Sequence, residues 1–176
     1  MKIDNVHIIS TKKGDQGTSK NYSNQSFSKD DILFDTLGTI DELSSHLGLT
    51  YHHTNYEKIK VIQTTLQAIN ALIATDLSVH PERYEALRKI NDKDIVALEE
   101  EGQKHLQQNP LEPRFVLPGS EATLGGAYCD LARAVCRRAE RTLVRYVNTT
   151  NRRDLEGPKK YLNRLSDFLF ILARSY

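Results

Sequence analysis

The segment DLARAVCRRAER carries arginines at intervals of four residues: Arg133, Arg137 and Arg141. In a helix this spacing places them in a row on one face, with Glu140 beside it. Like charges in a row destabilise a helix unless anions balance them, and the guanidinium fork matches phosphate oxygens bidentately. The polyphosphate of a nucleotide is one anion that would balance the row. A solvated face balanced by neighbouring acids is the alternative that the pattern leaves open.

A second polar group lies in the segment YLNRLSD near the C-terminus. At helical spacing, Asn163, Ser166, Asp167 and Phe170 share a face opposite a stripe of leucines. The amide of Asn163 is suited to hydrogen-bond a ribose or the edge of a base. The alternative is a polar outer face on which Arg164 and Asp167 pair with each other.

The stretch TKKGDQGTSKNYSNQSFSKDD, residues 11–31, consists mainly of Gly, Ser, Asn, Lys and Asp. Such a segment buries almost no apolar surface, so it is either a disordered tail or a loop ordered by a ligand. Phe115, in the proline-broken connection RFVLPG, also has two readings. It either plugs the end of a core or forms an apolar wall for a large flat ligand. Asp41, in GTIDELSS, is either half of an ion pair or ordinary surface.

The rest of the chain predicts long amphipathic helices, because apolar residues recur every three or four positions. The predicted ranges are 34–53, 56–78, 91–108, 121–147 and 158–175. Few alternating β-branched runs occur, so a sheet is improbable. We predict an all-α single domain, 1–176: an antiparallel five-helix bundle over 32–176, preceded by an N-terminal loop over 1–31.

Composition excludes several classes of protein. A net charge of +1 gives no global argument for binding nucleic acid or an anionic membrane. No apolar run approaches the roughly 18 residues of a membrane span, and the first residues lack signal or transit features, so we expect a cytoplasmic protein. Cys129 and Cys136 are seven apart, too far for a disulfide within one helix, and we expect both to be buried. Neither a zinc nor a di-iron pattern is present, and the histidines are expected to be structural or surface residues.

Taken together, five blocks resemble the PduO-type ATP:cob(I)alamin adenosyltransferases. They are TKKGDQGTS with SKDD, then GTIDELSSHLG, FVLPG, ARAVCRRAER and YLNRLSDFLFILAR, and they span essentially the whole chain in the family's order. The resemblance implies a homotrimer with active sites between subunits, which transfers the 5′-deoxyadenosyl group of ATP to cob(I)alamin. It also implies Mg²⁺ on the phosphates, an electron-donating reductase and a B12-dependent acceptor enzyme. Cobalt(I) is itself the nucleophile, so no nucleophilic side chain is required.

The resemblance also assigns roles to residues. The following fall on ATP-binding positions: Thr11, Lys12, Lys13, Gly14, Ser19, Lys20, Lys29, Arg137, Arg138, Ala139, Glu140, Arg141 and Asn163. Asp41 and Arg133 match a salt bridge between subunits. Phe115 matches the phenylalanine that closes the corrin pocket and keeps the lower axial ligand off cobalt. Arg137, Phe115 and Asn163 are therefore the predicted catalytic set.

The sequence departs from the family's pattern in KNYSNQSF, residues 20–27. Asn21 and Asn24 stand at or near glycine positions, and asparagine tolerates the left-handed conformation better than most residues. Ser26 stands in the region where relatives carry an arginine, and supplies no charge. The alternative function is therefore a noncatalytic trimeric protein that binds ATP and cobalamin for delivery or sensing.

Overall fold

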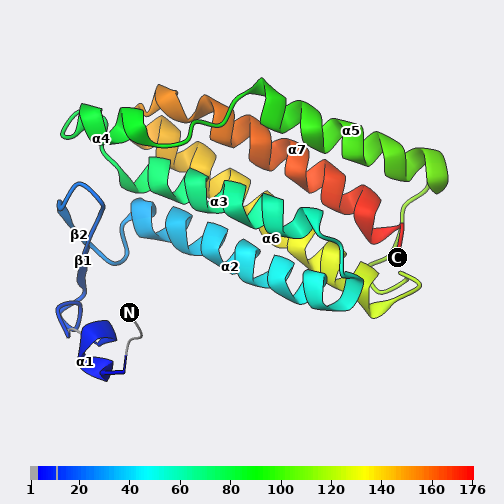
Figure 1. Cartoon of the computed structure of the whole chain (residues 1–176), viewed down its shortest axis with the longest axis horizontal. Helices are drawn as coiled ribbons and strands as arrows, with labels where there is room; N and C mark the ends of the chain where they lie inside the picture. The colour runs from blue at the N-terminus through cyan, green and yellow to red at the C-terminus, as the bar shows by residue number, and fades with distance from the viewer. Residues whose placement is uncertain (1–3, 11) are drawn as a thin grey trace.

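The computed structural model describes residues 4–10 and 12–176, and the described chain is mostly helical. The long helices are α2 (Ile32–Thr54), α3 (Lys58–Ala74), α5 (Asp92–Gln108), α6 (Leu124–Thr150) and α7 (Glu156–Ala173). The short elements are α1 (Val6–Ile9), β1 (Thr18–Lys20), β2 (Ser26–Ser28), α4 (Pro81–Ala86) and the 3₁₀ helix η1 (Arg153–Leu155). Figure 1 shows the long helices lying side by side along the length of the molecule.

The ends of the helices follow from local capping. Asn91 caps α5 by accepting from the Lys93 amide, while Asp94 accepts from the Asn91 amide, which confirms the predicted start. The α6 helix begins at Leu124, three residues later than predicted, because the Thr123 side chain caps it.

Packing buries the predicted apolar stripes. The α6 helix lies against α2 and α7, α3 lies against α2, and α5 lies against α7. The inward positions predicted for α6 and α7 are all buried: Ala132, Val135, Cys136, Ala139, Leu143, Leu162, Leu165, Leu169 and Leu172. At the junction of the two helices, a Cβ added to Gly126 would lie 2.7 Å from the Ala173 carbonyl oxygen. Glycine there allows the start of α6 to contact the end of α7.

The prediction of no sheet is wrong for the N-terminal segment, where β1 and β2 form an antiparallel hairpin. Ser19 pairs with Phe27 at its centre. Asn24 adopts φ 63° in the connecting turn, as its residue type predicted. In Figure 1 this hairpin and α1 extend beyond the end of the helices.

The tip of the hairpin is anchored to the C-terminal end of α3. The Tyr22 amide donates to the Ala74 carbonyl oxygen at 2.9 Å, and the Asp76 amide donates to Ser23 Oγ at 2.8 Å. Gln25 Nε2 donates to Asp76 Oδ2 at 3.1 Å. These contacts occupy the backbone where the predicted helix would have continued to residue 78, so α3 ends at Ala74. Over residues 4–10 and 12–176, no helix has both the length and the apolar character needed to cross a membrane.

Candidate active site

The predicted cationic segment and the predicted asparagine meet at one pocket. This α6–α7 pocket has a volume of about 330 Å³ and is lined by Arg137, Glu140, Arg141, Val144 and Asn163. Asn163 Nδ2 donates to Glu140 Oε1 at 3.0 Å, joining α7 to α6. Arg141 Nη1 donates to the Arg137 carbonyl oxygen at 3.1 Å. Two guanidinium groups, one amide and one carboxylate therefore surround the cavity.

This set of side chains is suited to a polyphosphate. Two arginines against one carboxylate leave the pocket with an excess of positive charge, and guanidinium N–H groups bind phosphate oxygens directly. Within the described part of the chain, no group of three or more His, Cys, Asp or Glu side chains is arranged to hold a metal ion. Cys129 and Cys136 are buried, as predicted, and burial raises the pKa of the Cys129 thiol to about 12. A thiolate nucleophile is therefore not available from Cys129.

Three other residues of the arginine-rich segment lie outside the pocket lining. Arg138 forms an ion pair with Glu42 of α2. Ala139 is buried and belongs to the core. Arg133 Nε contacts Asp130 Oδ1 at 2.9 Å within α6. The predicted row is thus divided. Arg137 and Arg141 line the cavity, whereas Arg133 pairs with Asp130, about one turn earlier in α6.

The polar face predicted for α7 is only partly present. Ser166 was expected beside Asn163 on an outer face, but it is 3 % exposed and its hydroxyl donates to the Asn163 carbonyl oxygen at 2.9 Å. Because this hydrogen bond within α7 satisfies the hydroxyl, Ser166 can be buried among the core leucines. Arg164 pairs with Asp167 at 2.7 Å, so the alternative proposed for that pair is present. The site and the polar outer face therefore coexist on one helix.

The predicted loop residues lie mainly at the base of the N-terminal hairpin. Lys12 adopts a left-handed φ of 57°, and Lys13 and Lys29 are exposed. A Cβ at Gly14 would lie 2.9 Å from Lys29 Nζ, so glycine at this position makes room for the ammonium group. Thr11 lies outside the described residues.

The hairpin itself carries the remaining two loop residues. Lys20 Nζ donates to Asn24 Oδ1 at 2.9 Å, and Ser19 belongs to β1. None of the described loop residues lines the α6–α7 pocket, so this chain alone does not bring the two predicted halves of the ATP site together.

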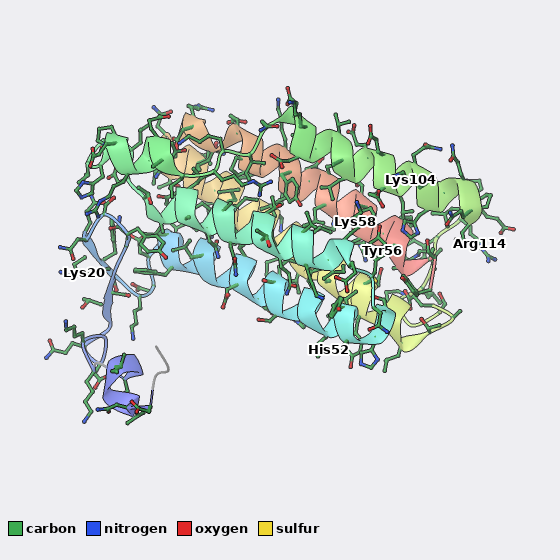
Figure 2. The ribbon with its side chains drawn as sticks, in the orientation of Figure 1. Lys20, His52, Tyr56, Lys58, Lys104 and Arg114 are labelled. Atoms are coloured by element: carbon green, nitrogen blue, oxygen red, sulfur yellow. The ribbon has the colours of Figure 1, made fainter. Side chains whose placement is uncertain are left out.

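A larger cavity of about 620 Å³ lies at one end of the helices, beneath the connection between α5 and α6. We call it the end cavity; it is lined by Pro110, Leu111, Glu112, Arg114, Phe115, Val116, Leu117, Ser120, Glu121, Ala122, Phe170, Ala173 and Arg174. Phe115 is 86 % exposed, so it does not plug the core, and the interpretation as an apolar wall fits its position. Figure 2 shows Arg114 of this connection at the end opposite to Lys20 on the hairpin.

Two residues of the end cavity were not identified from the sequence. Phe170 was placed on the polar face of α7 without a role, and Arg174 was not singled out. The Arg174 guanidinium lies 4.4 Å from the centre of the Phe170 ring, a cation–π contact. Nothing in the spacing of ILARSY distinguishes this arginine from a surface residue; only the tertiary contacts do.

Asp41 is exposed on α2, and no salt bridge between it and Arg133 forms within this chain. In the described structure, Arg133 pairs instead with Asp130. Burial alone would raise the pKa of Asp130, but hydrogen bonds from Arg133 and Arg174 outweigh it and hold this pKa below its ordinary value. The Asp41–Arg133 pair between subunits stays a prediction.

The described chain is thus a set of long packed helices with a cationic pocket between two of them and an aromatic-lined cavity at one end. The chain belongs to the cobalamin adenosyltransferase family, whose model matches residues 9–176. It is 37 % identical over 180 residues to the human corrinoid adenosyltransferase MMAB, covering 98 % of this chain and 70 % of that one. It is 34 % identical to a corrinoid adenosyltransferase of Citrobacter freundii, covering 96 % and 94 % of the two chains.

A solved structure supports the same relationship. It is a variant PduO-type ATP:corrinoid adenosyltransferase from Lactobacillus reuteri in complex with cobalamin and ATP. The two chains are 29 % identical and superpose with a TM-score of 0.83, over 95 % of this chain and 92 % of that one.

Proposed function

We propose that this protein transfers the 5′-deoxyadenosyl group of ATP to cob(I)alamin, forming adenosylcobalamin and triphosphate. One observation carries the proposal: in a chain of this family, Arg137, Arg141 and Asn163 converge with Glu140 on a single pocket. These groups supply the positive charge and the amide that a nucleotide triphosphate requires.

The reaction needs positioning and charge neutralisation rather than a protein nucleophile. Cobalt(I) supplies the electron pair for the new cobalt–carbon bond, and the bond between C5′ and the α-phosphate oxygen breaks, releasing triphosphate. The charge that develops on the leaving oxygen must be stabilised, and fixed guanidinium groups do this without reorganisation. Arg137 and Arg141 are the residues to which we assign this role, and Asn163 orients the nucleoside.

Mg²⁺ is part of this proposal as a companion of ATP. Glu140 is the carboxylate among the described residues that line the pocket, and this donor set suits an ion held chiefly by phosphate oxygens and water. Bound in this way, Mg²⁺ would further neutralise the triphosphate.

The end cavity is the proposed site of the corrin. Phe115, together with Phe170 and Leu117, offers the apolar surface that a large macrocycle requires. We assign Phe115 the role of keeping the lower axial ligand off cobalt, which makes cob(II)alamin easier to reduce. An external reductase would supply the electron, and an adenosylcobalamin-dependent enzyme would accept the product.

The assembly that we propose is a cytoplasmic homotrimer of five-helix bundles with active sites between subunits. Its support is the position of the hairpin, which is anchored at the end of α3 and contributes no described residue to the α6–α7 pocket of its own chain. Lys12, Lys13, Gly14 and Lys29 would then complete the ATP site of a neighbouring subunit. The Asp41–Arg133 pair would join the same subunits.

An anaerobic assay tests the proposed function. The protein is incubated with ATP, Mg²⁺ and chemically reduced cobalamin, and the appearance of adenosylcobalamin is followed by absorbance. A time-dependent conversion that requires ATP is expected. If both ligands bind but no adenosylcobalamin forms, the enzyme proposal is wrong and the noncatalytic binding protein takes its place.

A further inference from the structure

Buried charges connect the loop that carries Phe115 to helices α6 and α7. Glu121 Oε2 accepts from the Gly119 amide at 2.8 Å, and Glu121 Oε1 lies 3.6 Å from Arg174 Nη1. The same Arg174 atom lies 3.0 Å from Asp130 Oδ1, which in turn contacts Arg133. We call Glu121, Arg174, Asp130 and Arg133 the charge network. It leads from the loop at the end cavity to the residue predicted to face another subunit.

The burial of the charge network is unusual for charged side chains. The side chain of Glu121 is 1 % exposed, that of Asp130 8 % and that of Arg174 10 %. Burying charges is costly, because the desolvation penalty can exceed the free energy that their mutual attraction returns. Arg174 balances two acids from different parts of the chain, so the loop and α6 are both held to the end of α7.

The contact of Glu121 with Gly119 fixes the shape of the loop. Gly119 adopts φ 87°, a left-handed conformation that glycine allows, and it stands four residues after Phe115. The connection from residue 109 to residue 123 contains no helix or strand to hold it. Glu121 therefore supplies a fixed point for the segment that carries Phe115.

The charge network also has unused hydrogen-bonding capacity at the end cavity. Glu121 Oε1 and Arg174 Nε are buried in the described structure without a hydrogen-bond partner, although Glu121 Oε1 has its longer ionic contact with Arg174. Both residues line the end cavity. Buried polar atoms are normally paired, so their exception is a reason to look for a ligand. The amide side chains around a corrin ring carry both donors and acceptors that would match.

We propose that Arg174 is a positioning residue for the adenosyl transfer: through Glu121 it holds the Phe115 segment over the end cavity, where the corrin binds. This inference rests on the proposed function. Arg174 acts on the corrin side of the reaction and leaves the α6–α7 pocket, which Arg174 does not line, unchanged. Replacing Arg174 should therefore impair the steps that involve cobalamin and leave ATP binding unchanged.

The test compares Arg174→Met with wild type in two assays, one starting from cob(II)alamin with a reductant and one from prereduced cob(I)alamin. Arg164→Met is the matched control, because Arg164 is likewise an ion-paired arginine, on α7, but lies outside the end cavity. We expect Arg174→Met to lower the rate from cob(II)alamin at least tenfold and the rate from cob(I)alamin less than threefold. KM for ATP should stay within twofold of wild type.

Electron paramagnetic resonance reports the axial ligand of bound cob(II)alamin directly. With ATP present, wild-type protein should convert bound cob(II)alamin to a form without its lower axial ligand, and Arg174→Met should lose that signal. Arg174→Lys should restore part of it by retaining the charge. If Arg174→Met does not fold, Glu121→Gln replaces it, since glutamine still accepts from the Gly119 amide but loses the charge that faces Arg174.

Equal losses in the two assays, a raised KM for ATP, or an unchanged spectrum would overturn the role of Arg174. Failure of the proposed function has a different signature, since wild-type protein would then form no adenosylcobalamin in either assay.

Discussion

Asn163 of α7 and Glu140 of α6 are joined by a hydrogen bond of 3.0 Å across the pocket that Arg137 and Arg141 also line. The contact fixes the amide at the pocket wall before any nucleotide arrives. An arrangement of this kind lowers the cost of ordering the side chain on binding.

We predict that Asn163→Ala lowers kcat/KM for ATP about tenfold, which corresponds to the loss of one hydrogen bond of about 1.4 kcal/mol. Steady-state kinetics with ATP varied at saturating cob(I)alamin measure this. Asn148→Ala, which removes an exposed amide from α6 outside the pocket, is the control. Similar kinetics for Asn163→Ala and wild type would remove the residue from the nucleotide site.

Arg137→Ala should lower kcat at least about a hundredfold, because it removes positive charge from the leaving triphosphate. Arg83→Ala removes the same charge from an exposed position on α4 and should change kcat less than twofold. Arg138→Ala should cost less than Arg137→Ala, since Arg138 pairs with Glu42 and does not line the pocket. Wild-type turnover in Arg137→Ala would contradict the phosphate role.

Phe115→Ala should slow the reaction from cob(II)alamin more than the reaction from prereduced cob(I)alamin. The free energy of unfolding should change by no more than about 0.5 kcal/mol, because the ring is 86 % exposed. Parallel rate measurements with a urea titration test both statements. A uniform loss of activity would count against a role in removing the axial ligand.

The anchored tip of the hairpin predicts an effect on ATP binding without an effect on chemistry. The double variant Ser23→Ala/Gln25→Ala removes two hydrogen bonds to Asp76. We expect KM for ATP to rise about fivefold, because a looser loop must be ordered on binding, while kcat at saturating ATP stays within twofold. Gln107→Ala, exposed on α5, is the control. An unchanged KM would show that the anchor does not position the loop.

The ionisation of Asp154 should make the free energy of unfolding depend on pH in the acid range. Burial alone would raise its pKa, but hydrogen bonds from Arg152 and from the Tyr84 hydroxyl at 2.6 Å outweigh this and lower it. The ionised form therefore stabilises the fold above the unfolded-state pKa of about 3.9, and this contribution is lost as pH falls through the lower folded-state value.

Asp154→Asn should accordingly cost about 2 kcal/mol of the free energy of unfolding at pH 7. Urea titrations of wild type and the variant at pH 7 and pH 3 measure the difference between their free energies of unfolding. This difference should be smaller at pH 3. An equal difference at pH 7 and pH 3 would mean that the ionisation of Asp154 does not contribute to the stability of the fold.

The sequence predicted the long helices well because their apolar residues repeat at helical spacing, and burial of Leu162, Leu165 and Leu169 follows from that pattern. The β1–β2 hairpin could not be predicted, since TSK and SFS are short and lack an apolar alternation. The end of α3 was misplaced for another reason. It is set by contacts with residues 22–25, which are distant in the sequence.

The candidate site was predictable where residue type and spacing carry the chemistry. Arg137 and Arg141 lie on a segment whose spacing suggested a phosphate ligand. Asn163 lies on one whose amide suited a ribose or base edge, and the structure brings the three residues to one pocket. The roles of Phe170 and Arg174 depend on which segments meet at the end of α7, and no local pattern encodes that. Ser166 shows the opposite error, because helical spacing alone does not tell which edge of a stripe is covered by a neighbouring helix.

A single uninterrupted helix, α6, carries residues of the α6–α7 pocket and of the charge network beside the end cavity. Asp130, in the charge network beside the end cavity, precedes Arg137 by seven residues of α6, a rise of about 10 Å. One residue inserted between them would shift Arg137 by about 1.5 Å and turn it by about 100°, moving its guanidinium off the pocket wall. The length of this stretch is therefore constrained independently of its residue types. Homologues that keep both sites should vary here by substitution and not by insertion or deletion.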